Sequence, residues 1–95
     1  MAATEMVMIF CYDITERGNR AQVSGILEDS GVRVQKSVFE SRLTRKAADA
    51  LFQRLSTFIE KGDSLRMYAL SNSGLARSRI EGGAPLPEKG EFWIV

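Results

Sequence analysis

A single carboxylate, Asp13, stands where the most apolar stretch of the chain ends. Residues 6–12 read Met-Val-Met-Ile-Phe-Cys-Tyr, and a turn-like segment follows Asp13. A carboxylate at the end of a strand, beside a loop, can hold a hard cation such as Mg²⁺, which keeps several of its waters. Asp13 is therefore the candidate metal ligand. The alternative is that its side chain only caps a turn or the helix that follows.

The absence of histidine excludes several kinds of site. No His-based acid–base pair, common serine triad or His-ligated zinc site is possible in these 95 residues. The only cysteine, Cys11, lies inside the apolar stretch and is interpreted as core. The apolar run is too short to span a membrane, and the start of the chain has no signal-peptide pattern. We therefore expect a cytoplasmic protein without a membrane partner.

Strand and helix patterns alternate along the chain. The run before Asp13 is apolar on both faces, which is typical of a buried strand. Val23, Ile26 and Leu27 have helical spacing, and Gly31 is expected to end that helix in the left-handed conformation. Alternation predicts strands at about 32–35, 38–43 and 65–70. A second helix is expected over about 45–61, capped by Thr44, with an apolar stripe formed by Ala47, Ala48, Leu51, Leu55, Phe58 and Ile59.

This order predicts an α+β, ferredoxin-like βαββαβ domain over residues 1–70, with two helices on one face of an antiparallel sheet. Because the first strand is apolar on both faces, the second face needs a cover, and we predict a homodimer packed sheet to sheet. Residues 71–95 form an extension rich in glycine and proline that ends in a strand pattern at 91–95. That terminal strand joins either its own sheet or the edge of the partner's sheet, and the second arrangement is preferred.

The charges are unevenly distributed. Residues 33–54 carry six basic and two acidic side chains, whereas residues 1–32 carry two basic and five acidic ones. A polarised surface of this kind can face a polyanion. Arg42 belongs to the basic block and is a candidate nucleic-acid contact.

Two blocks of sequence resemble a known family. Tyr12-Asp13-Ile14 closes the first apolar strand, and Arg33-Val34-Gln35 is followed by Ser37-Val38-Phe39-Glu40. These blocks, with Arg20 opening the first helix, closely resemble the small CRISPR-associated adaptation protein that works with the spacer integrase. The resemblance covers about residues 7–70. It implies a ferredoxin-like homodimer that is a magnesium-dependent endonuclease on single-stranded RNA or double-stranded DNA and bridges integrase dimers during spacer acquisition.

The resemblance also implies roles for individual residues, with Asp13 as the catalytic one. Tyr12 either orients a phosphate or fills the strand end, and Arg17 and Arg20 either stabilise phosphate charge or are solvated. Arg33 is expected to reach nucleic acid. Phe39 either stacks on a base or belongs to the core. Many relatives have a basic cluster before the first helix, whereas this chain has only Arg17-Gly18-Asn19-Arg20 there.

Two functions of different classes remain open. The first is a magnesium-dependent phosphodiesterase, favoured by Asp13 at a strand end. The second is a non-catalytic dimeric scaffold that binds a DNA duplex and the integrase, favoured by the basic block. Both functions need the same fold and the same nucleic-acid partner.

Overall fold

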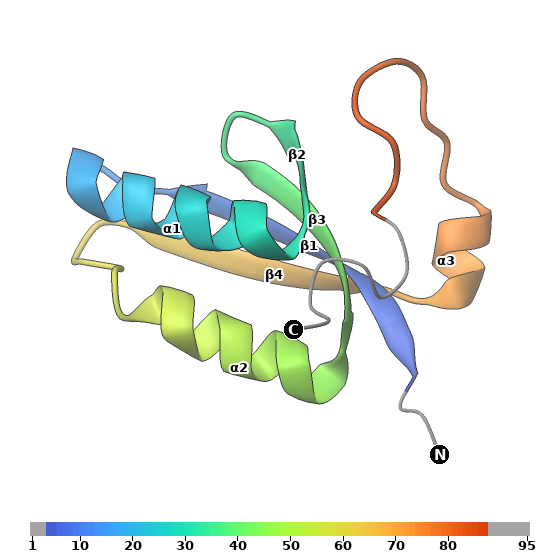
Figure 1. The fold of residues 1–95 in the computed structure, drawn as a ribbon, viewed down its shortest axis with the longest axis horizontal. Coiled ribbons are helices and arrows are strands. Elements are labelled where there is room, and N and C mark those ends of the chain that lie inside the picture. The colour runs from blue at the N-terminus through green and yellow to red at the C-terminus, as the bar shows by residue number, and fades with distance from the viewer. Residues whose placement is uncertain (1–3, 88–95) are drawn as a thin grey trace.

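The computed structural model describes residues 4–87 and has the predicted order of elements, followed by a short third helix (Figure 1). The elements are β1 (Glu5–Asp13), α1 (Arg17–Ser30), β2 (Val32–Gln35), β3 (Val38–Thr44), α2 (Arg45–Ser56), β4 (Ser64–Leu70) and α3 (Asn72–Ala76). All strand pairs are antiparallel, and the order in the sheet is β2-β3-β1-β4. The predicted α+β fold with a four-stranded antiparallel sheet is confirmed.

One face of the sheet forms the core. Helices α1 and α2 lie side by side on this face (Figure 1). Strand β1 turns Met8, Phe10 and Tyr12 toward them, all at most 6% exposed. The remaining buried members of this core are Ile14, Val23, Ile26, Leu27, Phe39, Leu43, Ala48, Leu51 and Leu55. The helical spacing of Val23, Ile26 and Leu27 therefore marks the buried face of α1, as predicted.

The opposite face of the sheet carries the alternate residues of each strand. Val7 is buried there, whereas Ile9 and Cys11 are only half-buried, and Tyr68 is 49% exposed. Glu40 lies opposite Ile9, and partial burial raises the pKa of its carboxyl group. Both long helices lie on the other side, and α3 has no buried residue. This open sheet face is where we predicted a second copy, and dimer packing remains a prediction.

Helix α2 is shorter than the sequence suggested. It begins after Thr44, whose hydroxyl accepts a hydrogen bond from the Ala47 amide at 3.2 Å, as predicted. It ends at Ser56 instead of residue 61, because the Thr57 hydroxyl donates to the Arg54 carbonyl at 2.7 Å and the chain tightens into turns. Phe58 and Ile59 still pack against the core from this turn. The predicted stripe is thus partly helical, and Ala47 is exposed.

Gly31 ends α1 for a different reason from the one predicted. Its backbone is extended, with φ −169° and ψ −158°, so the expected left-handed conformation is wrong. A Cβ atom on Gly31 would lie 2.2 Å from Ser41 Oγ and 2.3 Å from the Glu40 carbonyl oxygen. Glycine is needed here because β3 passes directly against the end of the helix.

We expect Gly31→Ala to lower the free energy of unfolding by about 2 kcal/mol, since the new methyl group meets backbone that cannot move aside. Gly25→Ala is the matched control, because a Cβ atom there meets nothing within 4 Å. Alanine in that helical position should stabilise the protein by up to about 1 kcal/mol. Urea unfolding of both variants checks the prediction, and equal effects of the same sign would contradict it.

The extension after β4 is described as far as residue 87. It begins with α3, whose first turn is capped by the Ser71 hydroxyl accepting from the Gly74 amide at 3.1 Å. The strand predicted at 91–95 lies outside the described residues. No helix in the described part of the chain is long and apolar enough to cross a membrane.

Candidate nucleic-acid interface

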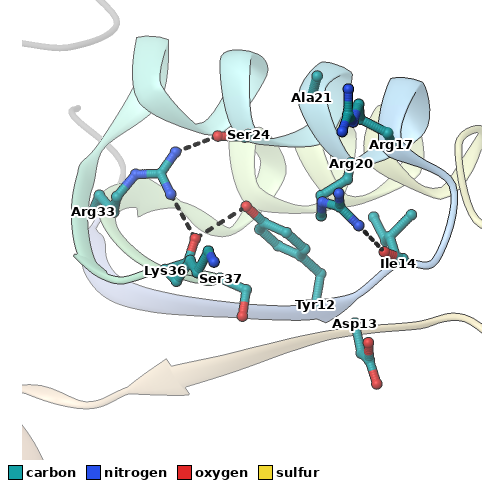
Figure 2. Close-up of a pocket in the computed structure, with 10 residues that line it drawn as sticks. All are labelled: Tyr12, Asp13, Ile14, Arg17, Arg20, Ala21, Ser24, Arg33, Lys36 and Ser37. Atoms are coloured by element: carbon teal, nitrogen blue, oxygen red, sulfur yellow. Dashed lines mark hydrogen bonds between the residues drawn. The ribbon is translucent and has the colours of Figure 1, made fainter.

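A basic pocket of about 510 Å³ lies at the end of β1. Its walls are the first half of α1 and the turn that joins β2 to β3 (Figure 2). Four cationic side chains line it, together with the Tyr12 ring: Arg17, Arg20, Arg33 and Lys36. Four of the predicted contact residues, Tyr12, Arg17, Arg20 and Arg33, are therefore brought together. Arg42 and Phe39 are not among the residues that line the pocket.

Tyr12 lines the pocket, and Phe39 packs beneath it in the core. The two rings stack with centroids 6.3 Å apart, and the Tyr12 hydroxyl donates to the Lys36 carbonyl at 3.5 Å. Phe39 has no exposed surface, and the guanidinium of Arg33 lies 4.8 Å above its ring. The structure therefore places Phe39 in the core, the second of the two roles considered for it, and leaves it no free face on which a base could stack.

The Arg33 side chain is already bound to protein groups on three sides. It donates to the Lys36 carbonyl at 2.6 Å, to the Ser24 hydroxyl, and to Glu28 Oε1 at 3.4 Å. Its pairing with Glu28 is the one ion pair between residues 4 and 87. Arg33 thus joins α1 to the β2–β3 turn and shapes the wall of the pocket.

The Arg20 side chain also binds backbone groups, whereas the side chains of Arg17 and Lys36 have no partner among the described residues. Arg20 Nη1 donates to the carbonyl of Ile14 at 3.0 Å (Figure 2). It also donates to the carbonyl of Thr15 at 3.3 Å. Within residues 4–87 the side chains of Arg17 and Lys36 make no hydrogen bond or ion pair. These two cations can therefore meet a phosphate without giving up an internal contact, which makes them the strongest candidates for binding.

Helix α1 begins at Arg17 because Glu16 caps it. The Glu16 carboxylate accepts hydrogen bonds from the amides of Gly18 and Asn19, both at 2.8 Å. These bonds lower the pKa of the Glu16 carboxyl group, with Arg20 adding a smaller attraction. The cap fixes the first turn of α1, and with it the position of Arg17 beside the pocket.

Asp13 lies at the same end of β1 but points the other way. Its side chain is exposed and directed away from the arginines in Figure 2, as expected from the alternation along a strand. Ile9 and Cys11 share its face of the sheet. Asp13 is nevertheless among the residues that line the basic pocket, and it also borders the open sheet face.

The described residues of one chain offer few clustered side chains that could bind magnesium. No group of three or more acidic, cysteine or histidine side chains gathers within the described residues. Asp13 has the oxygen chemistry that magnesium prefers and the exposure that lets the ion keep its waters. The residue therefore fits an outer carboxylate ligand.

Arg42 lies away from the pocket, on the open sheet face. Its Cα pairs with Val7 across the ladder, and its Nε is buried without a hydrogen-bond partner in the described residues. The basic block seen in the sequence is thus divided in three. Arg33 and Lys36 belong to the pocket, Arg42 belongs to the open face, and the remaining cations lie on α2.

Comparison with known proteins gives the family. A family model described as "CRISPR associated protein Cas2" matches residues 6–77. The chain belongs to the Cas2 family. It is 38% identical over 88 residues to the CRISPR-associated endoribonuclease Cas2 1 of Chloroflexus aurantiacus, covering 90% of this chain and 95% of the relative. The resemblance drawn from the two sequence blocks is confirmed.

Solved structures of the Cas2 family share the fold. The crystal structure of Streptococcus pyogenes Cas2 at pH 6.5 superposes with a TM-score of 0.69 at 31% identity. The match covers 81% of this chain and 100% of the Streptococcus pyogenes chain. A chain of a structure described as a partial Cas6-RT-Cas1–Cas2 complex superposes with a TM-score of 0.67 at 28% identity, covering 84% and 94%.

Five residues that line the pocket of this Cas2-family chain were not among the predicted site residues: Ile14, Ala21, Ser24, Lys36 and Ser37. Lys36 was noticed only as part of the basic block, and Ser24 was not singled out. Ser24 is half-buried on α1, and only the fold brings it to Arg33, nine residues further along the chain. The position of Lys36 in the link between two short strands, directly after Arg33-Val34-Gln35, was the available signal.

Proposed function

We propose that this Cas2-family chain binds the phosphates of nucleic acid at the basic pocket and cleaves RNA or DNA with magnesium held at Asp13. The observation that carries the proposal is the pair of free cations, Arg17 and Lys36, at the end of the strand that also carries Asp13. A relative at 38% identity bears the name endoribonuclease, which supports the same class of reaction. Bound magnesium would supply a polarised water and neutralise charge on the phosphate.

The chain's own residues would divide the work as follows. Arg17 and Lys36 bind the phosphate backbone, and Arg20 and Arg33 hold the pocket walls in place. Asp13 offers its carboxylate to the cation at the same end of β1. A duplex or single strand bound across this end of the sheet would therefore meet both groups, and its base sequence would not be read.

A second candidate function is a scaffold that does not cleave. It is favoured by the likeness to a chain from a structure described as a partial Cas6-RT-Cas1–Cas2 complex. It is also favoured because no group of three or more acidic, cysteine or histidine side chains gathers within residues 4–87. In this role the protein would bridge subunits of a Cas1-type integrase and hold a protospacer duplex by its phosphates. The two functions use the same pocket and differ in whether Asp13 is needed.

Reversing the charge of the two free cations tests the pocket. We expect Arg17→Glu with Lys36→Glu to weaken duplex binding by about tenfold or more at low salt, because phosphate contacts carry most of the affinity. The slope of log affinity against log salt should become shallower by about 2, since each lost phosphate contact reduces it by about 1. Fluorescence anisotropy with one labelled duplex over a series of salt concentrations measures both quantities.

The matched control reverses Lys46 and Arg54, which are exposed on α2 outside the pocket. It changes the net charge by the same amount, so any general attraction to DNA falls equally in both variants. We expect the control to keep most of the wild-type salt slope. If the two double variants lose affinity equally, the pocket is not the binding site.

A further inference from the structure

The loop that follows Asp13 is tied to the start of β4 by one carboxylate, Asp63. Asp63 Oδ1 accepts a hydrogen bond from the Thr15 amide at 3.1 Å, and Oδ2 accepts one from the Glu60 amide at 2.9 Å. The Asp63 amide in turn donates to the Glu60 carbonyl at 2.9 Å. Asp63 therefore closes its own turn and reaches across to the loop with its second oxygen.

The same loop is held from the opposite side by α1. Arg20 binds the carbonyls of Ile14 and Thr15, and the Ile14 side chain is only 3% exposed. The amide and the carbonyl of Thr15 are thus both satisfied by side chains from other elements. A short connection with this many fixed backbone groups has little freedom to move.

The ladder between β1 and β4 explains why this position matters. Its last Cα pair is Asp13 with Ser64, so the sheet itself stops holding β1 at the candidate ligand. Asp63 comes directly before Ser64. Beyond the last backbone pair of the ladder, the hydrogen bond from the Thr15 amide to the Asp63 carboxylate continues to join the two segments. Without that bond the end of β1 would be free to fray, since strand ends open more easily than strand centres.

We infer that Asp63 is a positioning residue that holds Asp13 in place by fixing the loop between β1 and α1. The inference rests on the proposed function for its catalytic consequence, and on the hydrogen bonds alone for its structural part. The bonds from the Glu60 and Thr15 amides also lower the pKa of the Asp63 carboxyl group, so the group is ionised, and a full acceptor, at neutral pH.

Graded substitutions at residue 63 separate positioning from general stability. Asp63→Ala removes both acceptors, whereas Asp63→Asn keeps one amide oxygen that can still accept a single bond. Asp29→Asn is the matched control, because Asp29 is exposed near the end of α1. The readouts are the hydrogen-exchange rate of the Thr15 amide by NMR, with the Phe10 amide as a core reference, and the kcat and KM of magnesium-dependent cleavage.

We expect Asp63→Ala to speed exchange of the Thr15 amide by about tenfold or more and to leave exchange at Phe10 unchanged, since one charge-assisted bond is lost locally. The kcat should fall by about tenfold and KM should stay within about twofold. A misplaced Asp13 carboxylate slows the cleavage step, whereas substrate binding depends on the basic pocket. Asp63→Asn should lie between Asp63→Ala and the wild type. Asp29→Asn should match the wild type in every readout.

Two results would overturn the inference. One is an unchanged exchange rate of the Thr15 amide in Asp63→Ala, whatever the cleavage rate. The other is faster exchange with wild-type kcat, which would show that a loose loop does not displace Asp13. If the wild-type chain cleaves nothing, the proposed nuclease activity fails separately, and the exchange rate of Thr15 alone decides whether Asp63 holds the loop. If Asp63→Ala does not fold, Asp63→Asn decides by the same measurements.

Discussion

Asp13→Asn is expected to lower magnesium-dependent cleavage of RNA and DNA by about a hundredfold or more while the protein stays folded and binds nucleic acid normally. Asparagine keeps the size and shape of the side chain but removes the charge that attracts the cation. Asp13 is exposed and points away from the arginines of the pocket, so the substitution leaves no buried group without a partner. Purified variant and wild type would be compared in single-turnover cleavage with magnesium.

Asp49→Asn is the control for this experiment, because Asp49 is exposed on α2 and its substitution makes the same chemical change. Cleavage by Asp13→Asn at the wild-type rate would show that the activity does not depend on this residue. Spacer acquisition with a Cas1-type partner distinguishes the two proposed functions. A scaffold would support acquisition with Asp13→Asn at the wild-type level, whereas a protein that must cleave would not.

Much of the fold was predictable because local pattern and tertiary structure agree in this chain. The apolar run before Asp13 predicted β1, and the alternation from Val32 onward predicted β2 and β3 within one residue of their observed ends. Thr44 predicted the start of α2 because its hydroxyl caps a helix without help from the rest of the fold. The end of α2 was predicted less well, since the apolar stripe continues into the turn after Ser56.

The reason for Gly31 could not be obtained from local sequence. A glycine after the last apolar position of a helix usually takes the left-handed conformation, and the pattern gave no sign of another cause. The actual constraint is the approach of Glu40 and Ser41, about ten residues further along the chain. Such a constraint exists only after the sheet has formed.

The candidate site was predicted in part, and strand alternation explains the rest. Phe39 and Arg42 differ by an odd number of positions on β3, so they must lie on opposite faces of the sheet. Since Phe39 faces the core, Arg42 faces the other side and cannot share a pocket with Tyr12. This conclusion was available from the sequence once the core face was known. The bonds of Arg33 and Arg20 were not, because they depend on how α1 lies on the sheet.

Ile9→Asp is expected to weaken self-association by about a hundredfold or more, if a second copy covers the open sheet face as we propose. Ile9 lies at the centre of that face, between Glu40 on β3 and Tyr68 on β4. A carboxylate there would be buried against the partner and beside Glu40, and burying an unpaired charge is costly. Sedimentation equilibrium over a range of concentrations measures the change. Ile80→Asp is the control, because Ile80 is 55% exposed and lies outside the sheet.

The same variant tests whether the dimer completes the metal site. Asp13 shares the open face with Ile9, so sheet-to-sheet packing could bring two Asp13 carboxylates toward one cation, as magnesium prefers. Ile9→Asp should then lose magnesium-dependent cleavage together with the dimer, although Asp13 and the basic pocket are intact. Circular dichroism of the variant checks that the monomer stays folded. A folded Ile9→Asp monomer that cleaves at the wild-type rate would show that one Asp13 is sufficient and that the partner contributes nothing to the site.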